Sequence, residues 1–437
     1  MTSNTRVVVI GTGIAGVRLV RQLRALGVAA LLIGEEEHPP YNRVLLAEVL
    51  AGRYGPDVIS LPTPPELIRA RVTRIDRAGR TLSCADGTVI PYDTLVLATG
   101  SHPVLPPLRG LFGSGRGLAE GVHAFRTLDD CLRLSKAVRP GARAVVVGGG
   151  LLGVSAARAL AVRGAHVVLA QKSERLMESH LDADASRLVQ RHLRDLGVEV
   201  HTECRVRDVR CDDGAVRRVE TADGHVFDAD LVVLACGAQP RVGLARDAGL
   251  AVDRGVVVDD ELRTSDPHIH ALGDCAQHDG TVYGLAAPAL EQADALARLL
   301  AASTADASTG GGTGTTRYKG TRTLTRLTLS CPGPENGPEP GFGPPPVSGL
   351  GPGPHPRTLE LAAFGETEVR PGDDVVRLAD ATRGTYRKVV VRDDRLVGGV
   401  LVGELGAVGA LARAWEGREP LPETGPLLHL LTNDGRS

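Results

Sequence analysis

Apolar residues occur in short runs that alternate with a helical pattern near the start of the chain. Residues 6–10 form a strand-like apolar run, and the glycine-rich residues 11–16 follow it directly. A helical pattern then extends to about Leu26, and a second apolar run covers residues 29–33. Strand, glycine turn, helix and strand in this order predict a βαβ unit with parallel strands and a right-handed crossover.

The same arrangement occurs a second time in the middle of the chain. An apolar run at residues 144–147 precedes the glycine-rich residues 148–153, and a helical pattern then reaches about Arg163. The next apolar run covers residues 166–170. Two such units predict an α/β fold with two Rossmann-like dinucleotide-binding domains.

Both glycine-rich segments have the spacing Gly-x-Gly-x-x-Gly between a strand and a helix. In this context the first glycine makes a tight turn, the second lets the backbone approach a diphosphate, and the third lets helix and strand pack closely. The helix N-terminus then offers unpaired N–H groups to the phosphates. The residues expected to line the loops are Gly11, Gly13, Ile14, Ala15 and Gly16 in the first copy and Gly148, Gly150, Leu151, Leu152 and Gly153 in the second.

The residue at the end of the second strand of each unit is expected to meet a ribose. Glu35 lies 24 residues beyond Gly11 and is placed to accept hydrogen bonds from a ribose diol. The second copy has Gln171 there, followed by Lys172 and Arg175. Glutamine neither pairs with a 2′-hydroxyl as a carboxylate would nor repels a 2′-phosphate, so NADH and NADPH both stay open.

The C-terminal third has a different pattern. Residues 303–316 are small and polar and are interpreted as a flexible linker. Strands are predicted at 322–329 and 358–364, and a hairpin is predicted from residues 386–402. Residues 331–356 hold 10 of the 28 prolines and 7 glycines, so we expect a mobile insertion outside any core.

Composition narrows the function classes. The formal net charge of -2 and the aromatic content of 3% give no case for nucleic-acid or anionic-membrane binding. No run approaches the roughly 20 apolar residues of a membrane span, and an early strand argues against a signal peptide, so we expect a cytoplasmic protein. The seven cysteines lack metal-ligand or disulfide spacing, so no metal site is expected.

Two different dinucleotide sites in one chain indicate two cofactors, expected to be a tightly bound flavin and a transient nicotinamide. Three later motifs bear on which copy binds which: residues 95–100, residues 231–237, and the strand of residues 269–275, which ends in Gly273-Asp274. With these motifs the chain resembles the pyridine nucleotide–disulfide oxidoreductase superfamily over about residues 6–300. The resemblance implies that the first glycine motif holds FAD, that Asp274 bonds the ribityl chain, and that the second motif holds NADH or NADPH.

The resemblance also implies a domain layout and further cofactor contacts. The FAD-binding domain is expected at 1–122 and 242–302, the NAD(P)-binding domain at 123–241, and a small α+β domain at 317–437. The additional FAD contacts implied are Arg43, Val72, Ala98, Thr99, Gly100, Arg126 and Ala287, and Gly237 is implied for NAD(P). No catalytic side chain is expected, because hydride passes from cofactor to cofactor.

Finer features indicate the branch of the superfamily. The chain has no cysteine before Cys84, which argues against disulfide and peroxide chemistry. Residues 40–46, 283–288 and 318–320 resemble the flavoprotein portion of assimilatory nitrite and nitrate reductases. Two positions depart from relatives: Glu48 stands where ferredoxin-reductase-like proteins have lysine, and Ser155 stands where many have glutamate.

The expected function is electron transfer from NAD(P)H through FAD to a separate metalloenzyme or iron–sulfur acceptor, with a nitrate or nitrite reductase catalytic subunit as the main partner. The chain has no cysteine after Cys331 with which to bind such clusters itself. Two alternatives stay open: a ferredoxin or rubredoxin reductase, and a redox-sensing flavoprotein. A homodimer also stays open.

Overall fold

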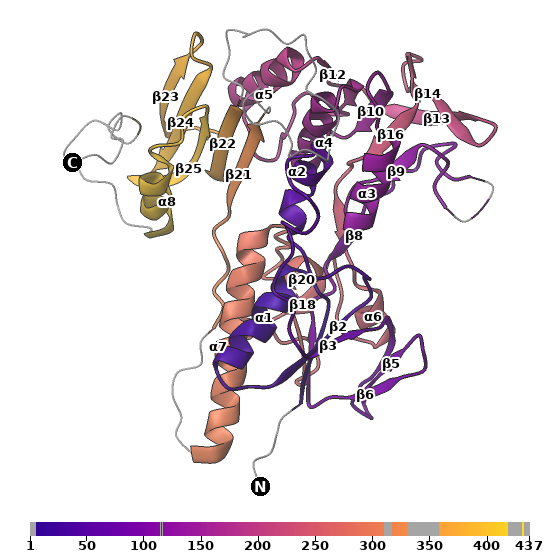
Figure 1. Ribbon diagram of the computed structural model, residues 1–437. Coiled ribbons are helices and arrows are strands. Elements are labelled where there is room, and N and C mark those ends of the chain that lie inside the picture. The colour runs from indigo at the N-terminus through magenta and orange to yellow at the C-terminus, as the bar shows by residue number, and fades with distance from the viewer. Residues whose placement is uncertain are drawn as a thin grey trace. The chain divides into compact units, whose positions relative to one another are not determined.

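The computed structural model describes residues 6–113, 115, 117–309, 317–330, 358–417 and 431. The chain divides into two compact units. The first unit comprises Met1–Leu45, Pro56–His102 and Ala238–Thr323. The second unit comprises Leu46–Gly55, Pro103–Gly237 and Leu324–Ser437. Each unit contains a five-stranded parallel sheet with helices packed against it, as Figure 1 shows.

The sheet of the first unit has the strand order β19-β7-β1-β2-β3. Its strands are β1 (Val7–Ile10), β2 (Ala30–Gly34), β3 (Leu67–Arg69), β7 (Thr94–Leu97) and β19 (Ile269–Ala271). Every residue of β1 is buried, as expected for a parallel strand covered on both faces. Because β1 lies between β2 and β7, the loops that follow these three strands meet at one edge of the sheet.

Helices α1 (Ile14–Ala25) and α7 (Ala286–Thr309) pack side by side in this unit (Figure 1). Arg18 of α1 makes a bidentate contact with Asp294 of α7, with N–O distances of 2.7 and 2.9 Å. Gln22 donates to the same carboxylate over 2.9 Å. These hydrogen bonds therefore hold α1 and α7 against each other beside the first glycine loop.

Smaller elements complete the first unit. An antiparallel sheet contains β4 (Val72–Asp76), β5 (Thr81–Cys84) and β6 (Val89–Pro91), and two-stranded sheets join β8 (Ser101–Pro103) to β17 (Ala238–Pro240) and β18 (Val256–Val258) to β20 (Ala276–His278). The short helices are η1 (Arg43–Leu45), α6 (Gly243–Asp247) and η2 (Gly273–Cys275).

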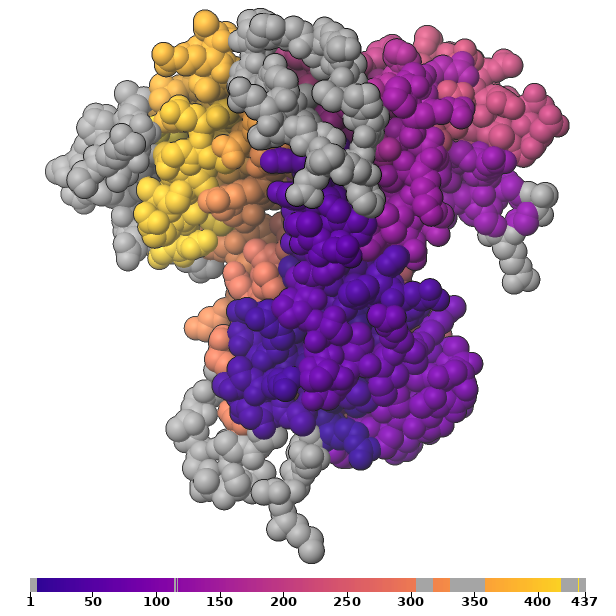
Figure 2. All heavy atoms as spheres, viewed as in Figure 1, coloured from indigo at the N-terminus to yellow at the C-terminus, as the bar shows by residue number. Residues whose placement is uncertain are grey.

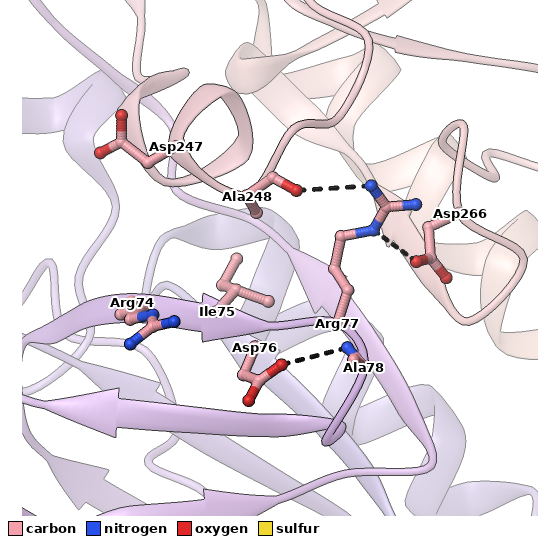
Figure 3. Close-up of a pocket in the computed structure, with 8 residues that line it drawn as sticks. All are labelled: Arg74, Ile75, Asp76, Arg77, Ala78, Asp247, Ala248 and Asp266. Carbon is pink, nitrogen blue, oxygen red and sulfur yellow. Dashed lines mark hydrogen bonds and ion pairs between the residues drawn. The ribbon is translucent and has the colours of Figure 1, made fainter.

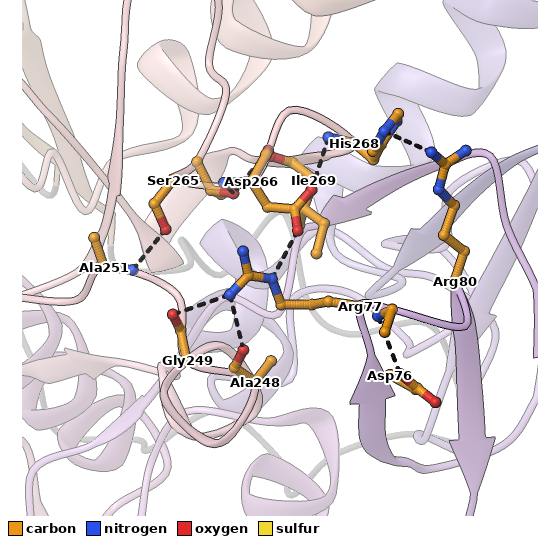
Figure 4. Close-up of polar contacts among 12 residues, drawn as sticks. Asp76, Arg77, Arg80, Ala248, Gly249, Ala251, Ser265, Asp266, His268 and Ile269 are labelled. Atoms are coloured by element: carbon orange, nitrogen blue, oxygen red, sulfur yellow. Dashed lines mark hydrogen bonds and ion pairs between the residues drawn. The ribbon is translucent and has the colours of Figure 1, made fainter.

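Arg77, in the turn after β4, connects the antiparallel sheet to residues that follow α6 (Figure 4). Its Nε donates to Asp266 over 2.7 Å, and its Nη1 donates to the carbonyls of Ala248 and Gly249 over 3.4 and 3.3 Å. Burial opposes ionisation of Asp266, but the hydrogen bonds and charge of Arg77 outweigh it and lower the pKa of that carboxyl. The contact therefore stabilises the unit above the ordinary aspartate pKa of about 3.9, and this stabilisation is lost as the pH falls through the folded pKa.

The second unit repeats the parallel architecture with the strand order β12-β11-β10-β16-β9. Its strands are β9 (Val122–Ala124), β10 (Arg143–Val147), β11 (His166–Ala170), β12 (Val198–His201) and β16 (Leu231–Leu234). The helices are α2 (Leu46–Leu50), α3 (Leu128–Ala137), α4 (Leu151–Val162) and α5 (Ala183–Asp195). An antiparallel sheet of β13 (Val206–Asp212), β14 (Ala215–Thr221) and β15 (Val226–Asp228) is added to them.

The C-terminal part of the second unit is an antiparallel sheet of order β21-β22-β25-β24-β23 with one helix. The strands are β21 (Leu324–Ser330), β22 (Thr358–Gly365), β23 (Asp374–Asp380), β24 (Thr385–Arg392) and β25 (Arg395–Val402), and the helix is α8 (Val408–Gly417). Phe364 and Trp415 pack together at its centre, with ring centroids 5.3 Å apart. Figure 2 shows the yellow C-terminal residues gathered in one continuous surface region.

The sequence-based fold class is confirmed: the chain contains two Rossmann-like domains and, in addition, a smaller C-terminal domain. The predicted domain boundaries stay a prediction. Helix α7 extends to Thr309, so helical structure occupies the first part of the segment interpreted as a linker at 303–316. Residues 310–316 and the predicted insertion at 331–356 lie outside the described residues. No helix in the described ranges is long and apolar enough to cross a membrane.

Candidate functional site

The first glycine loop connects β1 to α1 with a steric role for each glycine. Gly11 has φ +121°, and a Cβ there would lie 2.1 Å from the carbonyl oxygen of Ala98. A Cβ at Gly16 would lie 2.1 Å from the carbonyl oxygen of Gly11. At Gly13 an added Cβ would meet nothing within 4 Å, so this backbone faces open space. Gly13 also begins α1 without a side-chain cap, which leaves the first helical N–H groups directed at that space.

The second glycine loop, between β10 and α4, has the same steric pattern. Gly148 has φ +109°, and a Cβ there would lie 2.4 Å from the carbonyl oxygen of Ala235. A Cβ at Gly153 would lie 1.8 Å from the carbonyl oxygen of Gly148, whereas Gly150 faces open space and begins α4 uncapped. Two loops of this shape fit two diphosphates, one in each unit.

Glu35 follows β2 and lies beside two arginines, of which Arg241 hydrogen-bonds it. Nη1 of Arg241 donates to Oε1 of Glu35 over 2.5 Å, and Nε of Arg71 lies 3.8 Å from Oε2. The Glu35 side chain keeps 42% of its surface exposed. The carboxylate is therefore oriented but still accessible to a ribose.

Asp274 lies in η2, next to the end of the sheet. Ser101 donates to its Oδ2 over 2.9 Å. The preceding N–H, of Gly273, donates over 2.7 Å to Oε1 of Gln292, a side chain that is 1% exposed on α7. This turn is thereby fixed by side chains from two separate parts of the first unit, Ser101 and Gln292.

Arg43 lies in η1, beside Glu36 and Tyr41. Its guanidinium hydrogen-bonds Glu36 and lies 4.9 Å from the centroid of the Tyr41 ring. Burial opposes the charge of Arg43, but attraction by Tyr41, Glu36 and Asp274 outweighs it and raises the pKa of the guanidinium. The structure thus brings the predicted residues Arg43 and Asp274 within electrostatic reach of each other.

The first segment of the C-terminal third also reaches this part of the first unit. The hydroxyl groups of Tyr318 and Thr321 are 2.7 Å apart, and Thr321 donates to Glu291 of α7 over 2.6 Å. The N–H of Thr321 donates to the Tyr283 hydroxyl over 3.2 Å. Burial raises the pKa of the Tyr318 phenol, so it stays neutral. Helix α7 is therefore braced near its start by a residue 30 positions further along the chain.

Gln171, at the end of β11, has a different environment from Glu35. Its Oε1 accepts the N–H of Gly149 over 2.8 Å, and its Nε2 donates to the carbonyl of Arg175 over 3.3 Å. Only 7% of the residue is exposed. Gln171 therefore fixes the glycine loop instead of presenting its amide to solvent.

Lys172 is the first exposed residue after β11. Its charge lies near enough to Cys236 to act on that thiol, whose pKa is raised by burial and partly restored by Lys172. Arg175 lies 3.8 Å from Glu368 in the C-terminal part of the second unit. Lys172 is thus the cation that the structure presents beside the second loop.

The residues predicted to contact FAD and those predicted to contact NAD(P) lie in different units, with one exception. All residues predicted for NAD(P), including Gly237, lie in the second unit. Those predicted for FAD lie in the first unit, except Arg126, which precedes α3 in the second. The two residues that depart from relatives, Ser155 and Glu48, also lie in the second unit. Ser155 donates to the carbonyl of Leu151, and Glu48 forms an ion pair with Arg158.

Sequence reasoning did not include Arg241 or Gln292 among the site residues. The signal for Arg241 was its position directly after Gly237-x-x-Pro240, where the chain returns toward the first unit. Gln292 carries no comparable signal, because Glu291 and Asp294 make it one of several polar residues in this part of α7. Val72, predicted to contact FAD, is 8% exposed and packs in the core of the first unit.

A separate cavity of about 540 Å³ opens between β4 and α6 (Figure 3). Its lining mixes both charges, because Arg74 and Arg77 face Asp76, Asp247 and Asp266. Among the described residues that line it, none is a predicted cofactor contact. Arg77 is already hydrogen-bonded to Asp266, and we do not include the cavity in the candidate site.

Comparison with known proteins gives two family matches. Residues 5–293 match the model of the pyridine nucleotide-disulphide oxidoreductases. Residues 358–417 match the model of the rubredoxin NAD+ reductase C-terminal domain. Together they cover the two parallel sheets and most of the C-terminal sheet.

Similar curated proteins include two from Bacillus subtilis. A nitrite reductase [NAD(P)H] is 32% identical over 91% of this chain and 46% of its own length. An assimilatory nitrate reductase electron transfer subunit is 31% identical over 91% of this chain and 48% of its length. The chain therefore spans about half the length of these relatives. Putidaredoxin reductase CamA of Pseudomonas putida is 33% identical over 69% of this chain and 75% of its length.

Solved structures give the same architecture. A covalent putidaredoxin reductase–putidaredoxin complex matches with a TM-score of 0.78 and 25% identity, covering 99% of this chain and 100% of that one. The ferredoxin reductase for the CYP199A2 system from Rhodopseudomonas palustris matches with a TM-score of 0.73 and 26% identity, covering 91% of each chain.

Proposed function

Because this chain belongs to the pyridine nucleotide-disulphide oxidoreductase family, we propose that it carries electrons from NADH or NADPH, through FAD, to a separate metalloprotein of nitrate or nitrite assimilation. The observation that carries the proposal is the pair of glycine loops with matching steric roles, one in each unit. An enzyme with one dinucleotide has no use for two such loops. The nitrite and nitrate reductase relatives, alike over 91% of this chain, support the physiological role.

FAD would be held in the first unit. Gly13 and the start of α1 would bind its diphosphate, Glu35 would accept hydrogen bonds from the adenosine ribose, and Asp274 would bind the ribityl chain. The turn at Thr99 and Gly100, which closes onto the first loop, would line the same space. Arg43 would place a positive charge near it.

NAD(P)H would be held in the second unit. Gly150 and the start of α4 would bind its diphosphate, Gln171 keeps the loop in shape, and Lys172 would offer its charge to the ribose side of the coenzyme. The chemistry that FAD would supply in this site is acceptance of a hydride equivalent from the nicotinamide and release of electrons one at a time. The side chains described here orient the cofactors and set the local charge, and none has to act as a general acid or base.

A second candidate function is the reduction of a ferredoxin or rubredoxin. The match of residues 358–417 to the rubredoxin reductase C-terminal domain favours it. The likeness to putidaredoxin reductase favours it as well.

The two functions are separated by the acceptor. Protein reduced anaerobically with NAD(P)H is mixed in parallel with a sirohaem nitrite reductase catalytic domain, a [2Fe–2S] ferredoxin and a rubredoxin. Oxidation of the flavin is followed by absorbance, with the Gly150→Val variant as the control that cannot be reduced. We expect the fastest transfer to the nitrite reductase domain. Faster transfer to ferredoxin or rubredoxin, with none to the reductase domain, supports the second candidate instead.

A further inference from the structure

We propose that Arg241 is a further FAD-binding residue, which holds Glu35 in place, offsets negative charge at the adenosine diphosphate half of the cofactor, and so makes the site select FAD over FMN. The inference rests on the proposed function, in which the first glycine loop binds FAD. It assigns a role in that site to a residue outside the recognised motifs.

Arg241 connects two segments that flank the first glycine loop. Its backbone N–H donates to the carbonyl of Gly100 over 2.9 Å, and its carbonyl accepts the hydroxyl of Thr99 over 2.9 Å. Its side chain reaches Glu35, where Nη1 donates to Oε1 over 2.5 Å. Thr99 and Gly100 follow β7 and Glu35 follows β2, while the glycine loop follows β1 between them. Arg241 therefore bridges the ends of the strands on both sides of the loop.

The charge balance at the strand ends around the first glycine loop requires a cation. Glu35 begins a run of three glutamates that ends at Glu37. Arg43 pairs with Glu36 of this run, and Arg241 pairs with Glu35. A diphosphate at the glycine loop adds further negative charge, so an unpaired carboxylate at Glu35 would repel the ligand that it should help to bind. The Arg71 contact with Glu35, at 3.8 Å, is too long for a hydrogen bond and substitutes poorly for Arg241.

The geometry leaves room for the ligand. Arg241 occupies only Oε1 of Glu35, and the side chain of Glu35 keeps 42% of its surface exposed. Oε2 thus stays available to a ribose hydroxyl while Oε1 is fixed. His102, a second basic side chain near Arg241, is kept neutral because burial and the charge of Arg241 lower its pKa. The positive charge that hydrogen-bonds Glu35 is therefore the Arg241 guanidinium.

Selectivity follows from which half of the cofactor is recognised. FMN lacks the adenosine ribose and the second phosphate, so it gains nothing from Glu35 or from Arg241. Removing the guanidinium should weaken FAD binding and leave FMN binding unchanged. A purely structural role for Arg241 would weaken both alike.

The test measures the dissociation constants of FAD and FMN by quenching of flavin fluorescence, with wild type and variants stripped of flavin. Arg241→Met should raise the Kd of FAD about tenfold, since the contact is charge-assisted but half exposed, and should leave the Kd of FMN unchanged. Arg241→Lys should recover part of the loss. Arg246→Met, which removes an exposed arginine five residues further on, is the matched control and should change neither Kd.

A double-mutant cycle tests whether Arg241 acts through Glu35. In the Glu35→Gln background, Arg241→Met should raise the Kd of FAD less than about twofold, because the partner charge is already gone. Equal weakening of FAD and FMN by Arg241→Met, or an unchanged Kd for FAD, overturns the proposal. Retention of FAD by the Gly13→Val variant would instead place FAD outside the first loop, which is a failure of the proposed function. If Arg241→Met fails to fold, the Arg241→Lys and Glu35→Gln variants still decide the outcome.

Discussion

Arg158 and Glu48 form an ion pair with an N–O distance of 2.5 Å, in which the arginine side chain is almost completely buried. Nη1 of Arg158 also donates to the carbonyl of Ser330 over 2.5 Å, so helices α2 and α4 and strand β21 meet at one guanidinium. Glu48 had stood out in the sequence because relatives have a lysine there. The structure supplies the reason: glutamate at this position pairs with a buried arginine of α4.

Breaking this pair should destabilise the second unit. Glu48→Gln removes the carboxylate that pairs with the buried Arg158 guanidinium, and we expect a loss of about 3 kcal/mol in the free energy of unfolding. Urea denaturation measures the change. Glu48→Leu combined with Arg158→Met removes both charges and should recover most of the loss. A double variant less stable than Glu48→Gln would show that the pair does not act as a unit.

Asp182 should make the stability of the second unit depend on acid pH. Burial opposes its ionisation, but hydrogen bonds from Tyr386 at 2.7 Å, from the N–H of Ala185 at 3.0 Å and from Lys388 at 2.9 Å outweigh it and lower its pKa. The unfolded chain therefore takes up the proton first, at its ordinary pKa of about 3.9. The stabilisation is complete above about pH 4 and is lost as the pH falls through the folded pKa.

Asp182→Asn tests this dependence. At neutral pH the variant should lose about 2 kcal/mol, because one charge-assisted contact to a buried lysine is gone. Below about pH 4 the stability of the variant should change less steeply than that of wild type. Asp212→Asn, an exposed aspartate of β13, is the control. Parallel pH profiles for Asp182→Asn and wild type would contradict the assignment.

Gly13 and Gly150, the two glycines that face open space, allow the two cofactor sites to be blocked one at a time. Gly13→Val should yield folded protein without FAD, since the added side chain fills the space left for a diphosphate. Gly150→Val should keep FAD but lose NAD(P)H binding, for the same reason in the second loop. Neither glycine has positive φ, so valine adds no backbone strain. Flavin content and coenzyme titration give the readouts, and a swap of the two phenotypes would reverse the cofactor assignment.

Coenzyme preference should depend on Lys172 and not on Gln171. Lys172→Ala should weaken NADPH binding about tenfold, as the loss of one cation beside a 2′-phosphate would, and leave NADH binding unchanged. Gln171→Met removes the hydrogen bonds to Gly149 and Arg175 and should weaken both coenzymes alike. Calorimetric titration of each variant with both coenzymes measures these effects. Equal weakening of NADH and NADPH binding by Lys172→Ala would show that Lys172 does not recognise the 2′-phosphate.

Much of the fold could be predicted from local pattern. The helix after Gly13, the strand of residues 166–170 and the late hairpin were all expected within one or two residues of their observed bounds. Strong apolar runs and glycine spacing specify such elements. Strand β23 was missed, because its alternating charged and partly buried residues resemble a loop, and the first turns of helix in the predicted linker were missed because their residues are small and polar.

The site was predictable only where a motif marks it. The glycine loops, Glu35 and Asp274 belong to recognisable patterns. Arg241 belongs to none, and it joins the site through a hydrogen bond to Glu35, which lies 206 positions away in the sequence. Gln171 shows the opposite case. Its position indicated a ribose contact, but its two hydrogen bonds are local and bind the protein to itself. Long-range pairing and side-chain direction are settled by packing, which the sequence pattern does not encode.

The central claim is that one FAD, bound by the first unit, accepts electrons from NAD(P)H bound by the second. Anaerobic titration of the purified protein with NADH or NADPH tests it most directly, with FAD content and flavin absorbance measured on the same sample. We expect one FAD per chain and complete bleaching of the flavin band by one equivalent of reduced coenzyme. Protein without FAD, or a bound flavin that stays oxidised with both coenzymes, would contradict the account.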